Sequence, residues 1–233
     1  MINVPVFDYS SAPQRDSVVV LAAGPSTASN KDQILKYCEE NNSLIFGATY
    51  DYSKIGIVPN YTCFADIKKF EEQKNIIKTD IIIRGWTLQT NRKCFNSFFR
   101  SFSHKSYQFG EKQNIGGYKN YSVYGASQLK FDQHGRCLHS TIGITGLASF
   151  LMALMCRPKT LLFTGIDGKR NSDGKKEMFD GTLATDDKKA PKVIKFMQNT
   201  LFPYMTKIGV KVQTFDSVYI YGLDKSVLEI EVI

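Results

Sequence analysis

The sequence predicts an α/β fold, a doubly wound, Rossmann-like and mostly parallel sheet with an irregular aromatic-rich insertion. The first observation is the continuous apolar run at residues 18–21, typical of a strand buried on both faces of a parallel sheet. The second is that similar short runs alternate along the chain with segments of helical length. The third is that small or polar residues directly follow these runs, as at the ligand-binding edge of such sheets.

Residues 17–27 are predicted to organise the chain. The first apolar run breaks at Ala22-Ala23-Gly24-Pro25-Ser26, whose small side chains let backbone approach a ligand closely. Ser29 or Asn30 is then expected to cap a helix over residues 31–40. A strand, a tight turn and a helix N-terminus direct N–H groups and a positive dipole end at one point, which suits a phosphate. The turn matches neither the P-loop nor the G-x-G-x-x-G motif, so an ordinary connecting turn is the alternative.

Further strands follow from short apolar runs of the same kind, and the end of the chain predicts an edge strand. These segments are 43–47, 61–65, 80–84, 161–164, 211–215 and, for the edge strand, 227–233. Helices are expected at 67–74, from a cap at Ser140 or Thr141 to Met155, and at 190–208. The second of these is apolar almost all round and should be buried. The third is expected to be interrupted or kinked at Pro203.

The chain is predicted to be a single α/β domain over residues 1–233, with residues 89–138 as an insertion or lid. Aromatic residues in that insertion alternate with Asn, Ser, Lys and Gly without a steady period. This pattern fits either a cover over the site or a surface segment whose aromatic rings pack on the sheet. The five cysteines include no C-x-x-C pair, which favours reduced thiols in a cytoplasmic protein over metal ligands.

The formal net charge of +8 indicates an acidic partner, such as a phosphorylated small molecule or anionic lipid headgroups. The lysines lie in scattered pairs without a nucleic-acid-binding motif, which disfavours nucleic acid as the partner. The longest apolar segment, 142–155, is too short to span a bilayer, and the N-terminus lacks the pattern of a signal peptide. We therefore expect a cytoplasmic protein, with the inner membrane surface as a candidate location.

Small or polar residues at the predicted strand ends mark one edge of the sheet as the candidate site. They are Gly24-Pro25-Ser26, Thr49-Tyr50-Asp51, Asp66, Arg84 and Gly165-Ile166-Asp167. Asp66 and Asp167 are candidates to bind a ribose or a divalent cation, although helix capping is the favoured interpretation for Asp66. His139 precedes the apolar helix and is a candidate general base or phosphate ligand, with a structural role as the alternative.

Two segments together resemble a known family. The Ala-Gly-Pro-Ser turn, with Thr145-Gly146, the apolar helix and Thr164-Gly-Ile-Asp167, resembles the bacterial sialyltransferases that use CMP-sialic acid. With Pro59-Asn-Tyr61 leading to Asp66, the pattern also resembles the Maf flagellin glycosyltransferases and the archaeal 6-hydroxymethylpterin diphosphokinase group. The resemblance covers most of residues 17–85 and 139–168.

The resemblance implies a nucleotide site. It places Gly24, Pro25 and Ser26, with Thr27 beside them, at the nucleotide or diphosphate, Ala48 and Thr49 near the base or donor sugar, and Thr145 and Gly146 at the nucleotide. Two departures from the sialyltransferase pattern stand out. The chain has no histidine after His139, where those enzymes have a catalytic base, and Ala48-Thr49 replaces their strand-end asparagine.

The sequence and its resemblance predict a glycosyltransferase that moves a sugar from a CMP-activated or related nucleotide-sugar donor to an acceptor hydroxyl, without a required cofactor. The acceptor is a candidate glycan or lipid-linked molecule. His139 is the first candidate base, and Asp180 is the second because it lies in the loop where the sialyltransferase histidine would be. One alternative is a Mg²⁺-dependent pterin-type diphosphokinase with Asp66 as a metal ligand. The other is a nucleotide-binding protein without catalysis.

Overall fold

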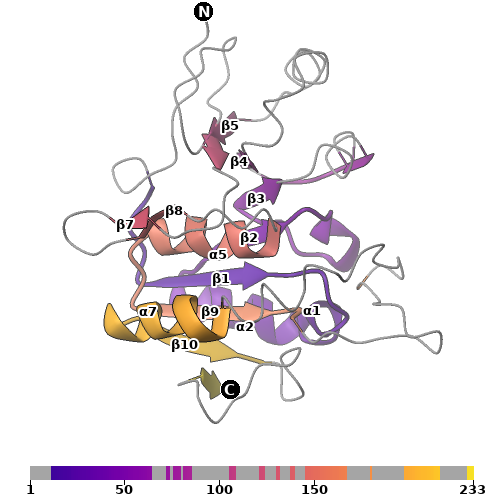
Figure 1. Cartoon of the computed structure of the whole chain (residues 1–233). Helices are drawn as coiled ribbons and strands as arrows, with labels where there is room; N and C mark the ends of the chain where they lie inside the picture. The colour runs from indigo at the N-terminus through magenta and orange to yellow at the C-terminus, as the bar shows by residue number, and fades with distance from the viewer. Residues whose placement is uncertain are drawn as a thin grey trace, which may run out of the picture.

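A parallel β-sheet forms the centre of the computed structural model in Figure 1. The structure describes residues 12–64, 72–73, 76–79, 81–85, 105–108, 121–123, 130–131, 137–139, 145–166, 179, 197–215 and 230–233. Within these residues the strand order is β11-β10-β9-β1-β2-β3-β4-β5, and β6 also pairs with β4. Every pairing in this sheet is parallel. The predicted α/β fold with a mostly parallel sheet is confirmed.

Strands β5 and β6 of the sheet lie in the predicted insertion, where no strand was expected, and the other strands begin and end close to their predicted positions. Their bounds are β1 (Ser17–Leu21), β2 (Leu44–Ala48), β3 (Tyr61–Phe64), β4 (Ile81–Gly85), β5 (Lys105–Gln108), β6 (Tyr121–Val123), β9 (Thr160–Thr164), β10 (Lys211–Thr214) and β11 (Ile230–Val232). A separate antiparallel pair consists of β7 (Lys130–Phe131) and β8 (Cys137–His139). Strand β11 lies at the end of the sheet beside β10, so the predicted edge strand is also confirmed.

Helices cover both faces of the sheet. They are α1 (Ser26–Ser29), α2 (Lys31–Asn41), the 3₁₀-helix η1 (Tyr52–Ile55), α5 (Thr145–Met155), the π-helix η3 (Met197–Leu201) and α7 (Phe202–Lys207). All five residues of β1 are buried. Val18 and Val20 pack in the cluster of α5 and α7, whereas Val19 and Leu21 pack with α2 and η1. This double burial explains why β1 is apolar without alternation.

The apolar helix packs as its composition predicts. Phe150 of α5 is 1% exposed and contacts Phe163 of β9 and Phe202 of α7, with ring centroids 5.5 and 6.3 Å apart. Helix α5 lies along β1, β2 and β3. No helix in the described part of the chain combines the length and apolar character that crossing a membrane requires.

The predicted helix over residues 31–40 is confirmed as α2, which begins at Lys31. A short helix that was not predicted, α1, precedes it, with Pro25 at its N-cap position. Asn30 then separates α1 from α2, and its side chain makes no capping hydrogen bond. The predicted break at Pro203 is confirmed, since η3 ends at Leu201 and α7 begins with Pro203 in its first turn.

The remaining predictions on organisation are tested only in part. Of the predicted insertion 89–138, the structure describes β5, β6, β7 and the first two residues of β8. The predicted helix 67–74 lies mostly outside the described residues. The three described cysteines, Cys38, Cys63 and Cys156, are free thiols, as predicted. Burial raises the pKa of each of them to about 12.

Candidate functional site

The topology places a ligand site at the carboxyl ends of β1 and β9. From β1 the chain builds β2, β3 and β4 outward on one side, and it later returns to place β9 and β10 on the other side. The strand order therefore reverses between β1 and β9. In open α/β sheets, ligands bind outside the carboxyl ends of the strands at such a reversal. We call this the carboxyl edge, and it lies to the right in Figure 1, where the arrow of β1 points.

The turn after β1 is joined to the end of β9 by three hydrogen bonds. The Ala22 N–H donates to the Thr164 carbonyl oxygen at 2.9 Å, and the Gly24 N–H donates to the Gly165 carbonyl oxygen at 2.9 Å. In the other direction, the Gly165 N–H donates to Ser26 Oγ at 3.0 Å. The two strand ends that flank the reversal therefore form a single bonded unit.

Gly165 is the glycine on which this joint depends. Its φ is +85°, and an added Cβ would lie 2.3 Å from both the Ala22 carbonyl oxygen and Thr27 Oγ1. The Thr27 hydroxyl itself donates to that carbonyl oxygen at 2.7 Å and is fully buried. No side chain fits at Gly165 without moving backbone atoms. By contrast, Gly24 is not among the glycines with positive φ.

The hydrogen bonds limit how the turn can hold an anion. The Gly24 N–H is already engaged, Pro25 has no N–H, and α1 has only four residues. A one-turn helix offers a weak dipole, so the predicted helix-dipole contribution is smaller than the sequence suggested. The half-buried Ser26 hydroxyl accepts from Gly165 and lies 3.5 Å from Thr164 Oγ1, which leaves a fixed hydroxyl group at the turn.

The carboxyl end of β2 carries backbone strain. Thr49 follows β2 with a φ of +64°, which is unusual for a β-branched side chain. It is 6% exposed, and its hydroxyl has no hydrogen-bond partner within the described structure. Its N–H donates to the Cys63 carbonyl oxygen at 2.9 Å, which ties it to β3. A strained, unpartnered polar residue at a strand end is a candidate ligand contact.

Tyr52 joins the ends of β1 and β2. Its hydroxyl lies 2.8 Å from the Leu21 carbonyl oxygen, 3.0 Å from the Ala48 carbonyl oxygen and 3.1 Å from the Ala48 N–H. It can therefore donate to one of these carbonyls while it accepts from the Ala48 N–H. Burial raises the pKa of Tyr52, so the hydroxyl stays protonated. The Ala48 backbone is thus occupied by Tyr52.

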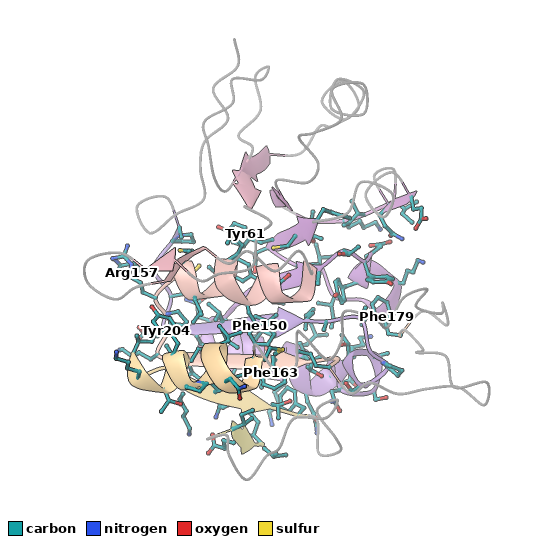
Figure 2. The ribbon with its side chains drawn as sticks, viewed as in Figure 1. Tyr61, Phe150, Arg157, Phe163, Phe179 and Tyr204 are labelled. Atoms are coloured by element: carbon teal, nitrogen blue, oxygen red, sulfur yellow. The ribbon has the colours of Figure 1, made fainter. Side chains whose placement is uncertain are left out.

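Phe179, which follows β9 in the sequence, also lies at this edge. Its N–H donates to the Ala23 carbonyl oxygen at 2.8 Å. Its ring stacks on Tyr52 with centroids 5.1 Å apart and meets Tyr50 edge-on at 5.9 Å. Figure 2 shows Phe179 at the carboxyl edge, at the opposite end of the sheet from Arg157. The ends of β1, β2 and β9 are therefore linked by contacts of Tyr52 and Phe179.

Asp51 has a structural role. Its Oδ1 accepts hydrogen bonds from the Ser53 hydroxyl at 2.7 Å, the Ser53 N–H at 3.2 Å and the Lys78 N–H at 3.4 Å. It thereby caps η1 and holds the segment that leads to β4. The part of the chain that the structure describes contains no group of three or more His, Cys, Asp or Glu residues that could hold a metal ion.

Apart from His139, the predicted site residues divide into three groups. Gly24, Pro25, Ser26 and Thr27 lie together at the reversal, and Ala48 and Thr49 lie at the neighbouring strand end. Thr145 and Gly146 are described as backbone only, as the first residues of α5. Asp66, Asp167 and Asp180 lie outside the described residues. Their roles stay predictions.

His139 is the last residue of β8, which pairs with β7 and packs along α5. Residues 140–144, between His139 and the first described residue of α5, lie outside the described residues, so its place directly before the helix stays a prediction. Within the described residues nothing places it beside the Gly24 turn, and its role as a base stays a prediction.

Sequence reasoning missed Tyr52 and Phe179. Tyr52 comes four residues after the end of β2, and its position in a short segment of alternating aromatic and polar residues is a weak signal for a buried bridge. Phe179 stands in a polar stretch where a single aromatic residue suggests an anchor on the core. In both cases the bonding partners, Leu21 and Ala23, are far away in sequence.

Comparison with known proteins supports the fold. No protein-family model and no curated protein matches the sequence. Among solved structures, the fold is similar to that of a Maf glycosyltransferase from Magnetospirillum magneticum, with a TM-score of 0.55 and 13% sequence identity. The match covers 99% of this chain and 35% of that one, so the chain spans about a third of the length of that protein. At this identity the match shows a Maf-like fold.

Proposed function

We propose that this chain is a glycosyltransferase that uses a nucleotide-sugar donor. The observation that carries the proposal is the bonded unit of the Ala22–Ser26 turn with Thr164 and Gly165 at the strand-order reversal. Sheets of this kind bind nucleotides at such a position. The Maf-like fold adds an analogy with a Maf glycosyltransferase.

The proposed chemistry needs a held donor and an oriented acceptor. The Ser26 hydroxyl is fixed by Gly165 and supplies a hydrogen bond to a phosphate oxygen of the donor. Thr49 supplies a second hydroxyl, at the end of β2. The acceptor oxygen attacks the anomeric carbon of the sugar, and the bond from that carbon to the phosphate oxygen breaks. The nucleotide leaves with that electron pair, and His139 or Asp180 takes the acceptor's proton.

A thermal-shift screen tests the proposal first. The full chain is mixed with cytidine and uridine nucleotides, their sugar conjugates, ATP and a hydroxymethylpterin, each with and without Mg²⁺. We expect a cytidine nucleotide or its sugar conjugate to raise the melting temperature without Mg²⁺. Stabilisation by ATP or the pterin that requires Mg²⁺ would instead support a diphosphokinase.

A matched pair of serine variants tests whether the stabilising ligand binds at the turn. Ser26 and Ser29 both lie on α1, but Ser26 bonds to Gly165, whereas the Ser29 hydroxyl donates to the Pro25 carbonyl oxygen and is exposed. We expect Ser26→Ala to weaken nucleotide binding about tenfold and Ser29→Ala to leave it unchanged. Equal affinities of both variants and the wild type would contradict binding at this turn.

Turnover measurements test catalysis separately from binding. Transfer and donor hydrolysis are measured for the wild type, His139→Asn and Asp180→Asn. A base should lose at least about a hundredfold in rate when replaced. An active wild type with both variants unimpaired would remove both residues as bases. A wild type that binds a nucleotide but shows no turnover would identify a binding protein without catalysis.

A further inference from the structure

The edge of the sheet opposite the candidate site carries a cluster of positive charge. Five basic residues lie at the amino ends of β1, β9 and β10, all of them exposed. We call them, together with Ile208, the amino-edge surface; the basic residues are Arg15, Arg157, Lys159, Lys207 and Lys211. They are five of the nine Lys and Arg residues whose side chains the structure describes.

Backbone hydrogen bonds hold the segments of this surface together. The Arg15 N–H donates to the Cys156 carbonyl oxygen at 3.1 Å. The Lys159 N–H donates to the Asp16 carbonyl oxygen at 2.9 Å, and the Lys211 N–H donates to the Lys159 carbonyl oxygen at 2.8 Å. The positive charges of Arg15 and Arg157 both oppose the rise in the pKa of the buried Cys156 thiol. Three segments distant in sequence thus present their cations at one edge.

Arg157 occupies a position that usually belongs to glycine. It follows α5 with a φ of +54°, and its N–H donates to the Leu154 carbonyl oxygen at 3.0 Å. Helices commonly end in this left-handed conformation with glycine, because a side chain there strains the backbone. A cation near a helix C-terminus interacts favourably with the helix dipole. An exposed arginine at a neighbouring position without backbone strain would make the same interaction. Arg157 is therefore a position with backbone strain that carries one of the five cations of the amino edge.

The surface has an excess of positive charge and one exposed apolar side chain. Lys159 pairs with Asp16 at 2.8 Å and Lys211 pairs with Glu231 at 2.7 Å. Asp16 and Glu231 thus compensate two of the five cations. Within the described residues, Arg15 and Lys207 have no carboxylate partner. Ile208, next to Lys207, is 41% exposed.

We propose that the amino-edge surface binds bilayers that contain anionic lipid headgroups. Clustered Lys and Arg side chains bind such headgroups by charge, and Ile208 adds an apolar group that can enter the interfacial region. Nucleic acid would match the charge, but it gains nothing from Ile208, and Tyr204, an aromatic residue near this edge, is buried rather than exposed for stacking. A second copy of a chain with a net charge of +8 would be repelled.

A bilayer bound at the amino-edge surface would leave the candidate site at the carboxyl edge accessible. Five-residue strands such as β1 and β9 are about 17 Å long, and they separate the amino edge from the carboxyl edge. Figure 2 shows Arg157 at one end of the sheet and Phe179 at the other. A bilayer bound at the first would not cover the second, so membrane binding and nucleotide binding should be independent of each other.

Sedimentation of the full chain with lipid vesicles tests the proposal. Vesicles of phosphatidylcholine alone are compared with vesicles that also contain phosphatidylglycerol. We expect binding to the anionic vesicles only, and its loss at high salt. Arg157→Gly with Lys207→Gln should reduce binding at least about tenfold. A control with the same charge change, Lys36→Gln with Lys54→Gln on the α2 and η1 layer, should keep it.

A second pair of variants separates charge from folding. Arg157→Gly should raise the melting temperature, since glycine adopts the left-handed conformation without strain, and still weaken vesicle binding. Asn42→Gly, at the left-handed end of α2, should raise the melting temperature without changing vesicle binding. The proposal is wrong if anionic vesicles do not bind, if both double variants weaken binding equally, or if a short oligonucleotide binds where vesicles do not.

Discussion

Two strand ends at the carboxyl edge adopt the same left-handed backbone conformation with different residue types. At the end of β9 the chain takes the left-handed conformation with Gly165, and at the end of β2 it does so with Thr49. The N–H and carbonyl groups of Gly165 are both bonded, to Ser26 and Gly24. Thr49 instead combines backbone strain with a buried hydroxyl that lacks a partner in the described structure.

The difference distinguishes a residue with a structural role, Gly165, from a candidate ligand contact, Thr49. Glycine at position 165 avoids backbone strain, and its hydrogen bonds join the ends of β1 and β9 at the strand-order reversal. Thr49 keeps strain and an unpaired polar group, each of which costs folding free energy. Such a cost is expected where a ligand later supplies the missing bond. Stability should therefore fall on substitution at Gly165 and rise on substitution at Thr49.

The largest effect is expected for Gly165→Ala. Its methyl group would collide with the Ala22 carbonyl oxygen and Thr27 Oγ1, and alanine disfavours a φ of +85°. The free energy of unfolding should fall by more than about 3 kcal/mol, measured by urea denaturation. Gly209→Ala is the control, because Gly209 has a φ of +76° but no atoms near the added methyl, so its cost should be about 1 kcal/mol. Similar losses at the two glycines would show that the joint is not tightly packed.

A smaller loss is expected for Tyr52→Phe. The change leaves the buried Ala48 N–H without its hydroxyl acceptor and removes the single proton that the hydroxyl donates to the Leu21 or the Ala48 carbonyl oxygen. The Ala48 carbonyl oxygen still accepts from the Tyr50 N–H. The unfolding free energy should fall by about 2 kcal/mol. Tyr37→Phe removes two half-buried hydrogen bonds, one donated to Gln213 at 2.8 Å and a long one accepted from the Ser17 hydroxyl at 3.5 Å, and should cost about 1 kcal/mol. If Tyr37→Phe cost more than Tyr52→Phe, Tyr52 would not be the bridge between β1 and β2.

The smallest effect on stability, with the opposite sign, is expected for Thr49→Gly. Glycine removes the left-handed strain and the unpaired hydroxyl but adds backbone entropy to the unfolded chain. We expect a net gain of about 1 kcal/mol in urea denaturation, together with weaker nucleotide binding. A loss of stability with unchanged nucleotide affinity would make Thr49 a structural residue and remove the contrast with Gly165.

The sequence predicted the sheet better than the joints within it. The apolar run of β1 identifies a strand buried on both faces, because that property belongs to the strand itself. The need for glycine at position 165 arises from Ala22 and Thr27, which lie about 140 positions earlier. No local pattern contains that information.

The start of α1 shows a different kind of limit. Asn30 takes the N-cap position of α2, as predicted, although its side chain makes no capping hydrogen bond. The capping pattern at Ser29 and Asn30 gave no sign of the short helix α1 before it, whose N-cap position is held by Pro25. The hydrogen bonds of Tyr52 could not be predicted from the sequence for another reason. Its partner Leu21 lies on a neighbouring strand. Local signals predicted which elements form, and tertiary contacts decided how their ends are joined.

Hydrogen exchange with and without CMP tests the central claim, that the carboxyl edge binds the donor nucleotide, most directly. We expect CMP to slow exchange in peptides that contain residues 22–28, 48–52 and 164–166, and to leave peptides of the amino edge, residues 156–160 and 207–211, unchanged. The Ser26→Ala variant should lose this protection, and Ser29→Ala should keep it. CMP protection confined to the amino edge, or absent from all three carboxyl-edge segments, would contradict the proposed site.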